Sequence, residues 1–139
     1  MLIDKKKQLK QEQNTVLVGI VTGGQTEQQL NEFLDELSFL AETAGVIAVK
    51  KFTQKLPHPD SRTFVGKGKL EEIKRYVSQH GDVELVIFED ELTGSQIQNI
   101  EKELGVKTIN SSDLILDIFA SRAKTAQARI QVELDQYQY

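Results

Sequence analysis

The spacing of hydrophobic residues alternates regularly along the chain. Short apolar runs rich in β-branched residues predict buried strands at 15–21, 46–54, 83–89 and 106–110. Apolar residues that recur every three or four positions predict amphipathic helices between them, at 26–44, 67–80 and 93–104. This alternation predicts an α/β fold, with a small, mostly parallel β-sheet flanked by helices.

Glycine and proline mark the boundaries of these elements. A glycine follows each of the three helical stretches, at Gly45, Gly81 and Gly105. Two prolines on either side of His58 make 55–62 a loop, because proline lacks the N–H that regular structure needs. The triplet 63–65 is expected to form a short extended piece before the next helix.

A longer helical stretch runs from Ser112 to Tyr139. Its apolar residues are three or four positions apart, at Phe119, Ala123, Ala126, Ile130, Leu134 and Tyr137. We call these residues the apolar stripe. A stripe of this length needs a partner helix, so the stretch is expected to begin an antiparallel helical hairpin that is truncated here. The prediction is a flexible charged tail at 1–13, an α/β subdomain at 14–111 and the first long helix of a helical subdomain at 112–139.

Composition narrows the class of protein. The chain has 139 residues and no cysteine, which excludes a disulfide framework, a thiol nucleophile and cysteine-based metal sites. No apolar run approaches the roughly 18 residues of a membrane span. The N-terminal residues are charged and lack the apolar core of a signal peptide. These features predict a soluble, cytoplasmic protein with no membrane span.

Charge is unevenly distributed along the chain. The net charge is −4, yet residues 50–75 hold eight basic and three acidic side chains. Residues 82–103 hold seven acidic side chains and one basic, Lys102. On charge alone the more common interpretation is two solvated faces, although the asymmetry leaves room for a local basic patch.

The stretch "SRTFVGKGKLEEI", at 61–73, resembles a phosphate-binding loop but lacks its parts. A Walker loop needs glycine five residues before Gly-Lys and a hydroxyl after it, whereas Thr63 and Leu70 occupy those positions. Two interpretations remain for the four residues Gly66, Lys67, Gly68 and Lys69. They form either an anion site at a helix N-terminus or a surface turn that uses glycine for its backbone geometry.

Other candidate residues give weaker signals. His58 and Asp60 are too few for a metal site, and no catalytic set can be argued from spacing, so neither a metal nor a catalytic residue is expected. Glu89, Asp90 and Glu91 follow a predicted strand and could hold Mg²⁺, but a solvated strand end is the more common interpretation.

Basic residues recur on the last helix. Arg122 and Arg129 are seven positions apart and so share a helix face, and Lys124 is nearby. Rows of this kind bind phosphate backbones, although a solvated helix flank is favoured by the pattern alone.

Four separated motifs, taken together, resemble the N-terminal domain of the HflX family of ribosome-associated GTPases. They are "GKGK" at 66–69, "LTGSQIQNIE" at 92–101, "LILDIFASRAKT" at 114–125 and "QVELDQYQY" at 131–139. The resemblance extends from about Thr15. The chain departs from it at 109–112, where Ile-Asn-Ser-Ser replaces the family's usual Ile-Asp-Arg-Thr, and at Gln127, where relatives commonly carry an acid or arginine. The first departure puts any ligand contact at 110–111 in doubt.

The resemblance implies a parent protein that hydrolyses GTP, binds the large ribosomal subunit and helps to split or rescue ribosomes. GTP and Mg²⁺ are expected in a GTP-binding domain outside this chain, and no cofactor is expected within it. The N-terminal domain is expected to contact rRNA and to regulate the GTP-binding domain. The resemblance makes rRNA-contact candidates of Arg122, Lys124 and Arg129, and rRNA or nucleotide candidates of Gly66–Lys69.

Two alternatives stay open. The Gly66–Lys69 loop could bind an accessory nucleotide such as ATP. The chain could instead be a plain interaction domain, in which the apolar stripe of the last helix pairs with a second copy.

Overall fold

The computed structural model describes residues 12–137, and their side chains as far as residue 131. The tail expected at 1–13 lies almost entirely outside these residues. Four strands form one fully parallel sheet, in the order β2-β1-β3-β4. They are β1 (Gln13–Val21), β2 (Val46–Lys55), β3 (Val83–Phe88) and β4 (Lys107–Asn110). The predicted α/β fold is confirmed.

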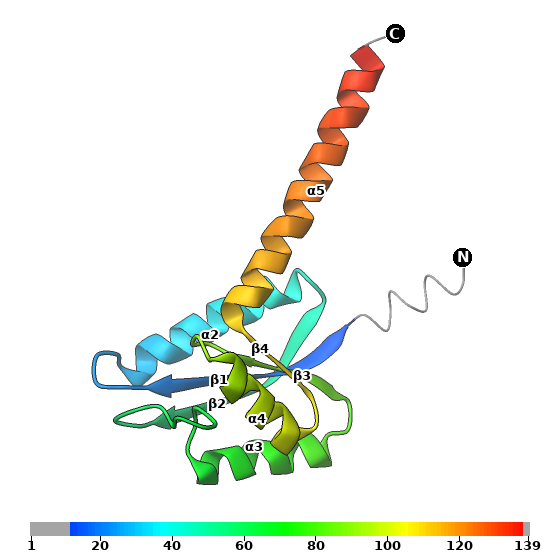
Figure 1. Ribbon diagram of the computed structural model, residues 1–139. Helices are drawn as coiled ribbons and strands as arrows, with labels where there is room; N and C mark the ends of the chain where they lie inside the picture. Colours follow the sequence, from blue (N-terminus) through cyan, green and yellow to red (C-terminus); the bar gives the residue numbers. More distant parts are fainter. Residues whose placement is uncertain (1–11, 138–139) are drawn as a thin grey trace.

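Helices cover both faces of the sheet (Figure 1). One face carries α2 (Glu27–Glu42) and the first turns of α5 (Ser111–Tyr137). The other face carries α3 (Lys67–Gln79) and α4 (Gly94–Leu104). Two separate apolar layers result, because the central strands β1 and β3 are buried on both sides.

Local sequence explains where two of the helices begin. Thr26 accepts a hydrogen bond from the backbone of Gln29, and the Gln29 side chain accepts one from the backbone of Thr26. Thr93 and Gln96 form the same reciprocal pair at the start of α4. Each capping box satisfies two backbone N–H groups that a helix end otherwise leaves unpaired.

A β-bulge in the edge strand β2 sets which side chains face which layer. The pairing with β1 skips Val49, since Thr15 lies opposite Ala48 and Val16 lies opposite Lys50. The extra residue changes the alternation of the strand. After the bulge, Lys51 faces α2, where it forms an ion pair with Asp35, while Lys50 and Phe52 lie on the side of α3.

The triplet 63–65 is not extended, so that prediction was wrong. Phe64 has a φ of 67°, in the left-handed region that bulky residues rarely adopt. Its backbone N–H and C=O pair with the C=O and N–H of Asp60, both at 2.9 Å. Its ring is buried and meets the ring of Phe88 edge-on, with centroids 6.2 Å apart. The buried ring and the two hydrogen bonds hold a backbone conformation that a bulky side chain disfavours.

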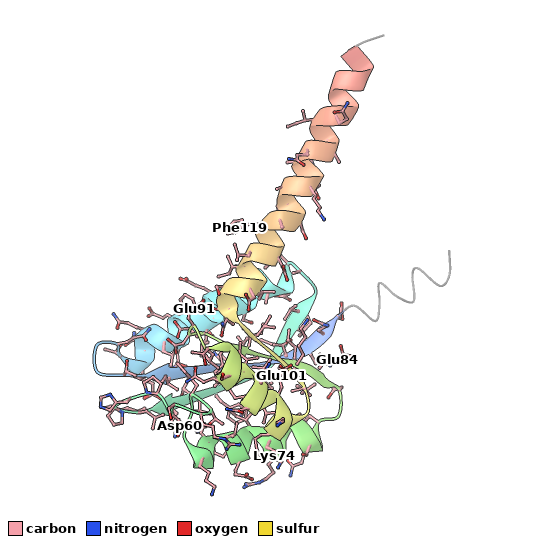
Figure 2. All side chains as sticks on the ribbon, viewed as in Figure 1. Asp60, Lys74, Glu84, Glu91, Glu101 and Phe119 are labelled. Atoms are coloured by element: carbon pink, nitrogen blue, oxygen red, sulfur yellow. The ribbon has the colours of Figure 1, made fainter. Side chains whose placement is uncertain are left out.

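The long helix α5 packs on the sheet only at its start. Leu114 and Ile118 are buried, whereas every residue from Phe119 to Gln131 is exposed. Figure 1 shows the helix projecting far beyond the sheet. Within the apolar stripe, Phe119 is 59% exposed and Ile130 is 55% exposed, and Figure 2 shows Phe119 pointing sideways from the helix.

Some sequence-based predictions for this helix are not tested. The side chains of Leu134 and Tyr137 lie outside the described residues. The helical hairpin and the division of the chain at 111–112 stay predictions. Among the described residues, no helix is long and apolar enough to cross a membrane.

Candidate functional site

The carboxyl ends of the parallel strands define one edge of the sheet where loops collect. The connection from β1 leads through α2 to β2 on one side, and the connection from β3 leads through α4 to β4 on the other. The crevice between two strands whose connections diverge in this way is where open α/β sheets bind ligands. The stretches 56–69 and 89–93 both lie at this edge.

The loop at 57–66 is organised around one carboxylate. Asp60 Oδ1 accepts hydrogen bonds from the backbone N–H groups of Arg62, at 2.8 Å, and Thr63, at 2.9 Å. These two bonds to the charged form hold the pKa of Asp60 below its ordinary value. His58, which the sequence paired with Asp60 as a weak metal candidate, is exposed. Asp60 therefore shapes the turn.

Helix α4 fastens this loop from the neighbouring strand connection. Gln96 Nε2 donates to the backbone oxygen of Asp60, at 3.0 Å, and Asn99 Nδ2 donates to that of Arg62, at 3.1 Å. Two motifs that are separate in the sequence, at 61–69 and 92–101, are thus in direct contact. Arg62 and Lys74 also lie within 4.0 Å of the Glu103 carboxylate of α4.

The glycines of "GKGK" do not serve backbone geometry, so the interpretation as a glycine-dependent turn was wrong. Gly66 has an ordinary φ of −67° and precedes α3, while Gly68 lies inside the first turn of α3. A Cβ on Gly66 would lie 2.8 Å from Nε2 of Gln54, so the end of that flexible side chain would have to move. Gln54 Oε1 also accepts the Gly66 N–H at 2.8 Å. A Cβ on Gly68 would meet nothing within 4 Å.

The two lysines of this motif have different surroundings. Lys69 is half-buried and its ammonium lies 2.7 Å from a carboxylate oxygen of Glu72, an ion pair that keeps the pKa of Glu72 below its ordinary value. Lys67 is exposed. No side chain caps the N-terminus of α3, in contrast to α2 and α4. Lys67 is therefore the more available cation for an outside partner.

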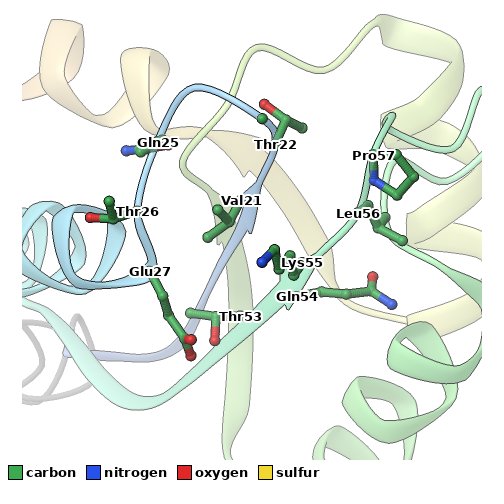
Figure 3. A pocket seen from close by; sticks show the side chains of 11 residues that line it. Val21, Thr22, Gln25, Thr26, Glu27, Thr53, Gln54, Lys55, Leu56 and Pro57 are labelled. Atoms are coloured by element: carbon green, nitrogen blue, oxygen red, sulfur yellow. The ribbon is translucent and has the colours of Figure 1, made fainter.

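A hollow of about 670 Å³ lies at the carboxyl ends of β1 and β2 (Figure 3). In Figure 3 the Glu27 carboxylate extends toward Thr53, and Lys55 comes from the end of β2. Gln54 also lines this hollow and is bonded to Gly66. The residues Gly66–Lys69 themselves do not line it.

Two carboxyl groups lie at the switch point after β3. Glu89 and Asp90 are half-buried, and one oxygen of each is buried without a hydrogen-bond partner. Burial, followed by the charge and hydrogen bonding of Asp90, raises the pKa of Glu89 to about 7. Burial is also the main reason that the pKa of Asp90 is raised. The expected solvated strand end is wrong for these two residues, although Glu91 is exposed.

The metal interpretation of this acidic run gains no support from the geometry. Among the described side chains, no group of three or more His, Cys, Asp or Glu is placed to hold a metal ion.

The residues 110–111, where the chain departs from the family pattern, hold this edge together. Asn110 Oδ1 accepts the N–H of Leu92 at 3.0 Å, and Asn110 Nδ2 donates to the Leu92 oxygen at 3.2 Å. Ser111 Oγ donates to the oxygen of Glu89 at 2.8 Å. Both residues are buried, so their observed role is to join β4 and α5 to the loop after β3.

Of the three basic residues predicted on the last helix, Arg122 and Arg129 share one face, as expected, and Lys124 does not. Arg122 and Arg129 line one shallow hollow with Ser121, Thr125 and Ala126. Lys124 is two positions from Arg122, which places it about 200° around a helix with 3.6 residues per turn. All three side chains are exposed. The arginines therefore form a pair, and Lys124 projects from nearly the opposite side.

Three aromatic side chains form a group that the sequence did not single out. They are Phe52, Tyr76 and His80. Only the four-residue spacing of Tyr76 and His80 on one helix could have indicated part of it.

Comparison with known proteins identifies the class of domain. Residues 31–120 match the family model described as GTP-binding GTPase N-terminal. The chain is 51% identical over 127 residues to GTPase HflX of Flavobacterium psychrophilum, covering 91% of this chain and 30% of that protein. It is 39% identical over 116 residues to GTPase HflX of Escherichia coli, covering 82% of this chain and 26% of that protein. The chain thus spans less than a third of the length of these relatives.

Solved structures support the fold. A crystal structure of SsGBP in complex with GDP superposes with a TM-score of 0.59 at 23% identity, covering 91% of this chain and 35% of that one. A GTP-binding protein from Sulfolobus solfataricus, also in complex with GDP, gives a TM-score of 0.54 at 24% identity, covering 78% of this chain and 30% of that one. The match to the family model over residues 31–120 shows that this chain belongs to the GTP-binding GTPase N-terminal family, as it occurs in the HflX GTPases.

Proposed function

We propose that this chain is the ribosome-binding and regulatory N-terminal domain of an HflX-type GTPase, acting in the cytoplasm on the large ribosomal subunit. The observation that carries the proposal is the match to HflX GTPases over about nine-tenths of this chain but less than a third of theirs. The remaining two-thirds of those relatives is where we place GTP hydrolysis, with its GTP and Mg²⁺. The parent protein would use that activity in splitting or rescuing ribosomes.

The sequence supports a non-catalytic role for this chain alone. Its single Gly-Lys-rich loop lacks the Walker spacing and the hydroxyl residue that would bind Mg²⁺. In the structure, Lys69 of that loop forms an ion pair with Glu72, and the Gly66 N–H donates a hydrogen bond to Gln54. A regulatory contact with a GTP-binding domain needs none of these parts.

Helix α5 is the proposed rRNA contact. It extends from the sheet with Arg122 and Arg129 exposed on one face, seven residues or about 10.5 Å apart along a helix that rises 1.5 Å per residue. Guanidinium groups bind phosphate oxygens in a bidentate way, which favours arginine for this task. Lys124, on nearly the opposite side, is assigned a minor role because it would meet RNA only in a different orientation of the helix.

A second proposed contact is the start of α3. The ammonium of Lys67 and the uncapped N–H groups of the first turn favour an anion there. The open space at Gly68 would let an RNA backbone approach closely.

Cosedimentation with purified large ribosomal subunits over a salt series tests this function. Arg122→Gln/Arg129→Gln is compared with Lys51→Gln/Lys102→Gln, a matched loss of two charges on exposed residues of β2 and α4. We expect the arginine variant to bind more weakly. The slope of log K against log salt is negative, and its magnitude should fall by about 0.7–0.9 for each lost phosphate contact. Equal binding by the two variants would refute the α5 contact. No binding by the parent chain at low salt would refute ribosome binding by this domain alone.

The uncapped start of α3 also favours a second candidate function, the accessory binding of a nucleotide such as ATP. In this alternative the phosphates would contact Lys67 and Lys69. Titration calorimetry with ATP should then show heat that is lost in Lys67→Ala/Lys69→Ala. Unchanged heat in that variant would exclude the Gly66–Lys69 loop as the nucleotide site.

The exposed stripe on α5 favours a third candidate, self-association. Phe119 and Ile130 are each more than half exposed, and burying both against a second copy would be favourable. Sedimentation equilibrium should then show a mass that rises with concentration in the parent chain but not in Phe119→Ser/Ile130→Ser. A strict monomer would refute it.

A further inference from the structure

A column of three aromatic rings lies where α3 meets the edge strand β2. The rings of Phe52 and Tyr76 meet edge-on, with centroids 5.8 Å apart and an angle of 78°. The rings of Tyr76 and His80 stack nearly parallel, with centroids 4.0 Å apart and an angle of 20°. Phe52 and Tyr76 are half-buried and pack against the apolar layer, whereas His80 is exposed. The column therefore has an anchored inner end and a solvent-exposed outer end.

The outer ring is held in place by its own backbone bonds. His80 Nδ1 lies 2.9 Å from the backbone oxygen of Tyr76, and His80 N donates to the same oxygen at 3.0 Å. A carbonyl oxygen only accepts, so Nδ1 carries the hydrogen in this contact. The ring is thus fixed parallel to Tyr76 before any ligand arrives, and a planar ligand that stacks on it pays little ordering entropy.

Two cations, Lys50 and Arg75, lie beside the column. Lys50 Nζ lies 5.6 Å from the ring centroid of Phe52 and 6.0 Å from that of Tyr76. A shallow hollow of about 250 Å³ is bounded by Lys50, Phe52, Glu72, Arg75, Tyr76 and Gln79. Its one carboxylate, Glu72, is already paired with Lys69. Glu72 also attracts Arg75, but a single carboxylate cannot balance Lys50, Lys69 and Arg75, so the net charge at the rim is positive.

We propose that this surface, which we call the ring column, binds unpaired nucleotides of RNA, with a base stacked on the Tyr76–His80 pair and phosphates on Lys50 and Arg75. Stacked aromatic rings beside cations are the means by which proteins hold single-stranded nucleic acid without reading its sequence. The rim cations are distinct from Arg122 and Arg129 of α5. The inference deepens the proposed function and rests on it for the choice of RNA as the partner in the cell.

The chemistry favours RNA over two other anionic ligands. An acidic peptide would use Lys50 and Arg75 but would gain nothing from the flat face of His80. A free nucleotide would use one ring and one cation, and the hollow is too shallow to enclose it. A strand of several nucleotides can engage the exposed ring and both cations at once, since Lys50 and Arg75 come from different elements.

Fluorescence anisotropy with a labelled single-stranded oligoadenylate of about ten nucleotides tests this inference, at a length within the usual range for one stacking surface. Tyr76→Leu removes the ring but keeps an apolar side chain, and Tyr76→Phe keeps the ring. We expect His80→Ala, which removes the ring that the base would contact, to raise Kd by roughly 5- to 100-fold, the usual loss per stacked base. Tyr76→Leu removes the ring that supports His80 and should also weaken binding, while Tyr76→Phe should bind like the parent chain. His80→Ala changes only an exposed side chain, so it should weaken binding without unfolding the protein. Arg75→Gln should weaken binding, and Lys102→Gln, on the exposed face of α4, should not.

The outcomes separate this inference from the proposed function. Unchanged RNA affinity in both Tyr76→Leu and His80→Ala would overturn it, whatever the ribosome experiment shows. AMP that binds as tightly as the oligonucleotide would overturn the assignment to RNA. Polyglutamate that competes equally with RNA would overturn the stacking role. Loss of ribosome binding in Arg122→Gln/Arg129→Gln, with RNA binding by the ring column intact, would support both contacts independently.

Discussion

The side chain of Asn110 exchanges two hydrogen bonds with the backbone of Leu92, accepting its N–H at 3.0 Å and donating to its oxygen at 3.2 Å. An amide can do both at once, whereas an ionised carboxylate has no hydrogen to donate. Asn110 is 6% exposed, so water cannot replace either bond easily. This pair joins the end of β4 to the loop that starts α4.

Asn110→Asp should destabilise the fold. The carboxylate would leave the Leu92 oxygen unpaired in a buried position, at a cost of about 1–3 kcal/mol. Protonation would restore a donor, so the difference from the parent chain should narrow as the pH falls from 7 toward 4. Urea unfolding monitored by circular dichroism over this pH range measures the effect. A difference in unfolding free energy that does not vary with pH would contradict the donor role of the Asn110 amide.

Gln96→Glu should loosen the loop at 57–66. The glutamate keeps the oxygen that caps the Thr93 N–H but loses the amide hydrogens that bind the backbone oxygen of Asp60. Hydrogen–deuterium exchange should therefore become faster in this loop while α4 remains protected. Gln98→Glu adds the same charge on an exposed position of the same helix and is the matched control. Equal exchange in the two variants would show that the Gln96 tether is not needed.

The long-range hydrogen bonds of Asn110 and Gln96 could not be predicted from the spacing of residues along the chain. Apolar periodicity predicted the strands and helices, because burial of a face repeats every two or 3.6 residues. It failed at Phe64, whose left-handed backbone is stabilised by contacts with residues distant in the sequence or across a tight turn. Nothing within the triplet 63–65 signals that Gln96 and Asn99 will hold the preceding turn.

The candidate sites were predictable in part, for the same reason. The cations at Lys67, Arg122 and Arg129 could be named from the sequence, because charge and helical spacing are local properties. Lys69 is less available to an outside anion because its ammonium is paired with Glu72, and the sequence alone does not show that this pair forms. The ring column requires Phe52 of β2 to lie beside Tyr76 of α3, which only the sheet order and the bulge at Val49 arrange.

Glu89→Gln should remove a pH dependence of stability. The pKa of Glu89 is about 7 in the folded protein and near the ordinary 4.5 when unfolded, so the folded state holds an extra proton between these values. Stability from this group is full below about pH 4.5 and is lost as the pH rises through 7. Glu89 is half-buried and water screens part of the effect, so we expect a loss of about 1 kcal/mol in the parent chain that the variant does not show.

Unfolding free energies at several pH values between 5 and 8 measure this difference. Glu91→Gln is the control, because Glu91 carries the same charge two residues away but is exposed. The Glu89→Gln protein should gain stability relative to the parent chain as the pH rises, and the Glu91→Gln protein should not. Parallel curves for all three proteins would contradict the burial of a protonated Glu89.

Replacing Gly66 or Gly68 of "GKGK" by alanine should affect stability and ribosome binding differently. Gly66→Ala places a Cβ 2.8 Å from Nε2 of Gln54, so the end of that side chain must move and the hydrogen bond from the Gly66 N–H should weaken, at a cost of up to about 1 kcal/mol. Gly68→Ala meets nothing within 4 Å and lies in a helix, so it should stabilise the fold by up to about 1 kcal/mol. If an RNA backbone approaches α3 at Gly68, the more stable variant should nevertheless bind large ribosomal subunits more weakly. Urea unfolding and cosedimentation measure the two effects, and unchanged ribosome binding by Gly68→Ala would exclude close approach at this position.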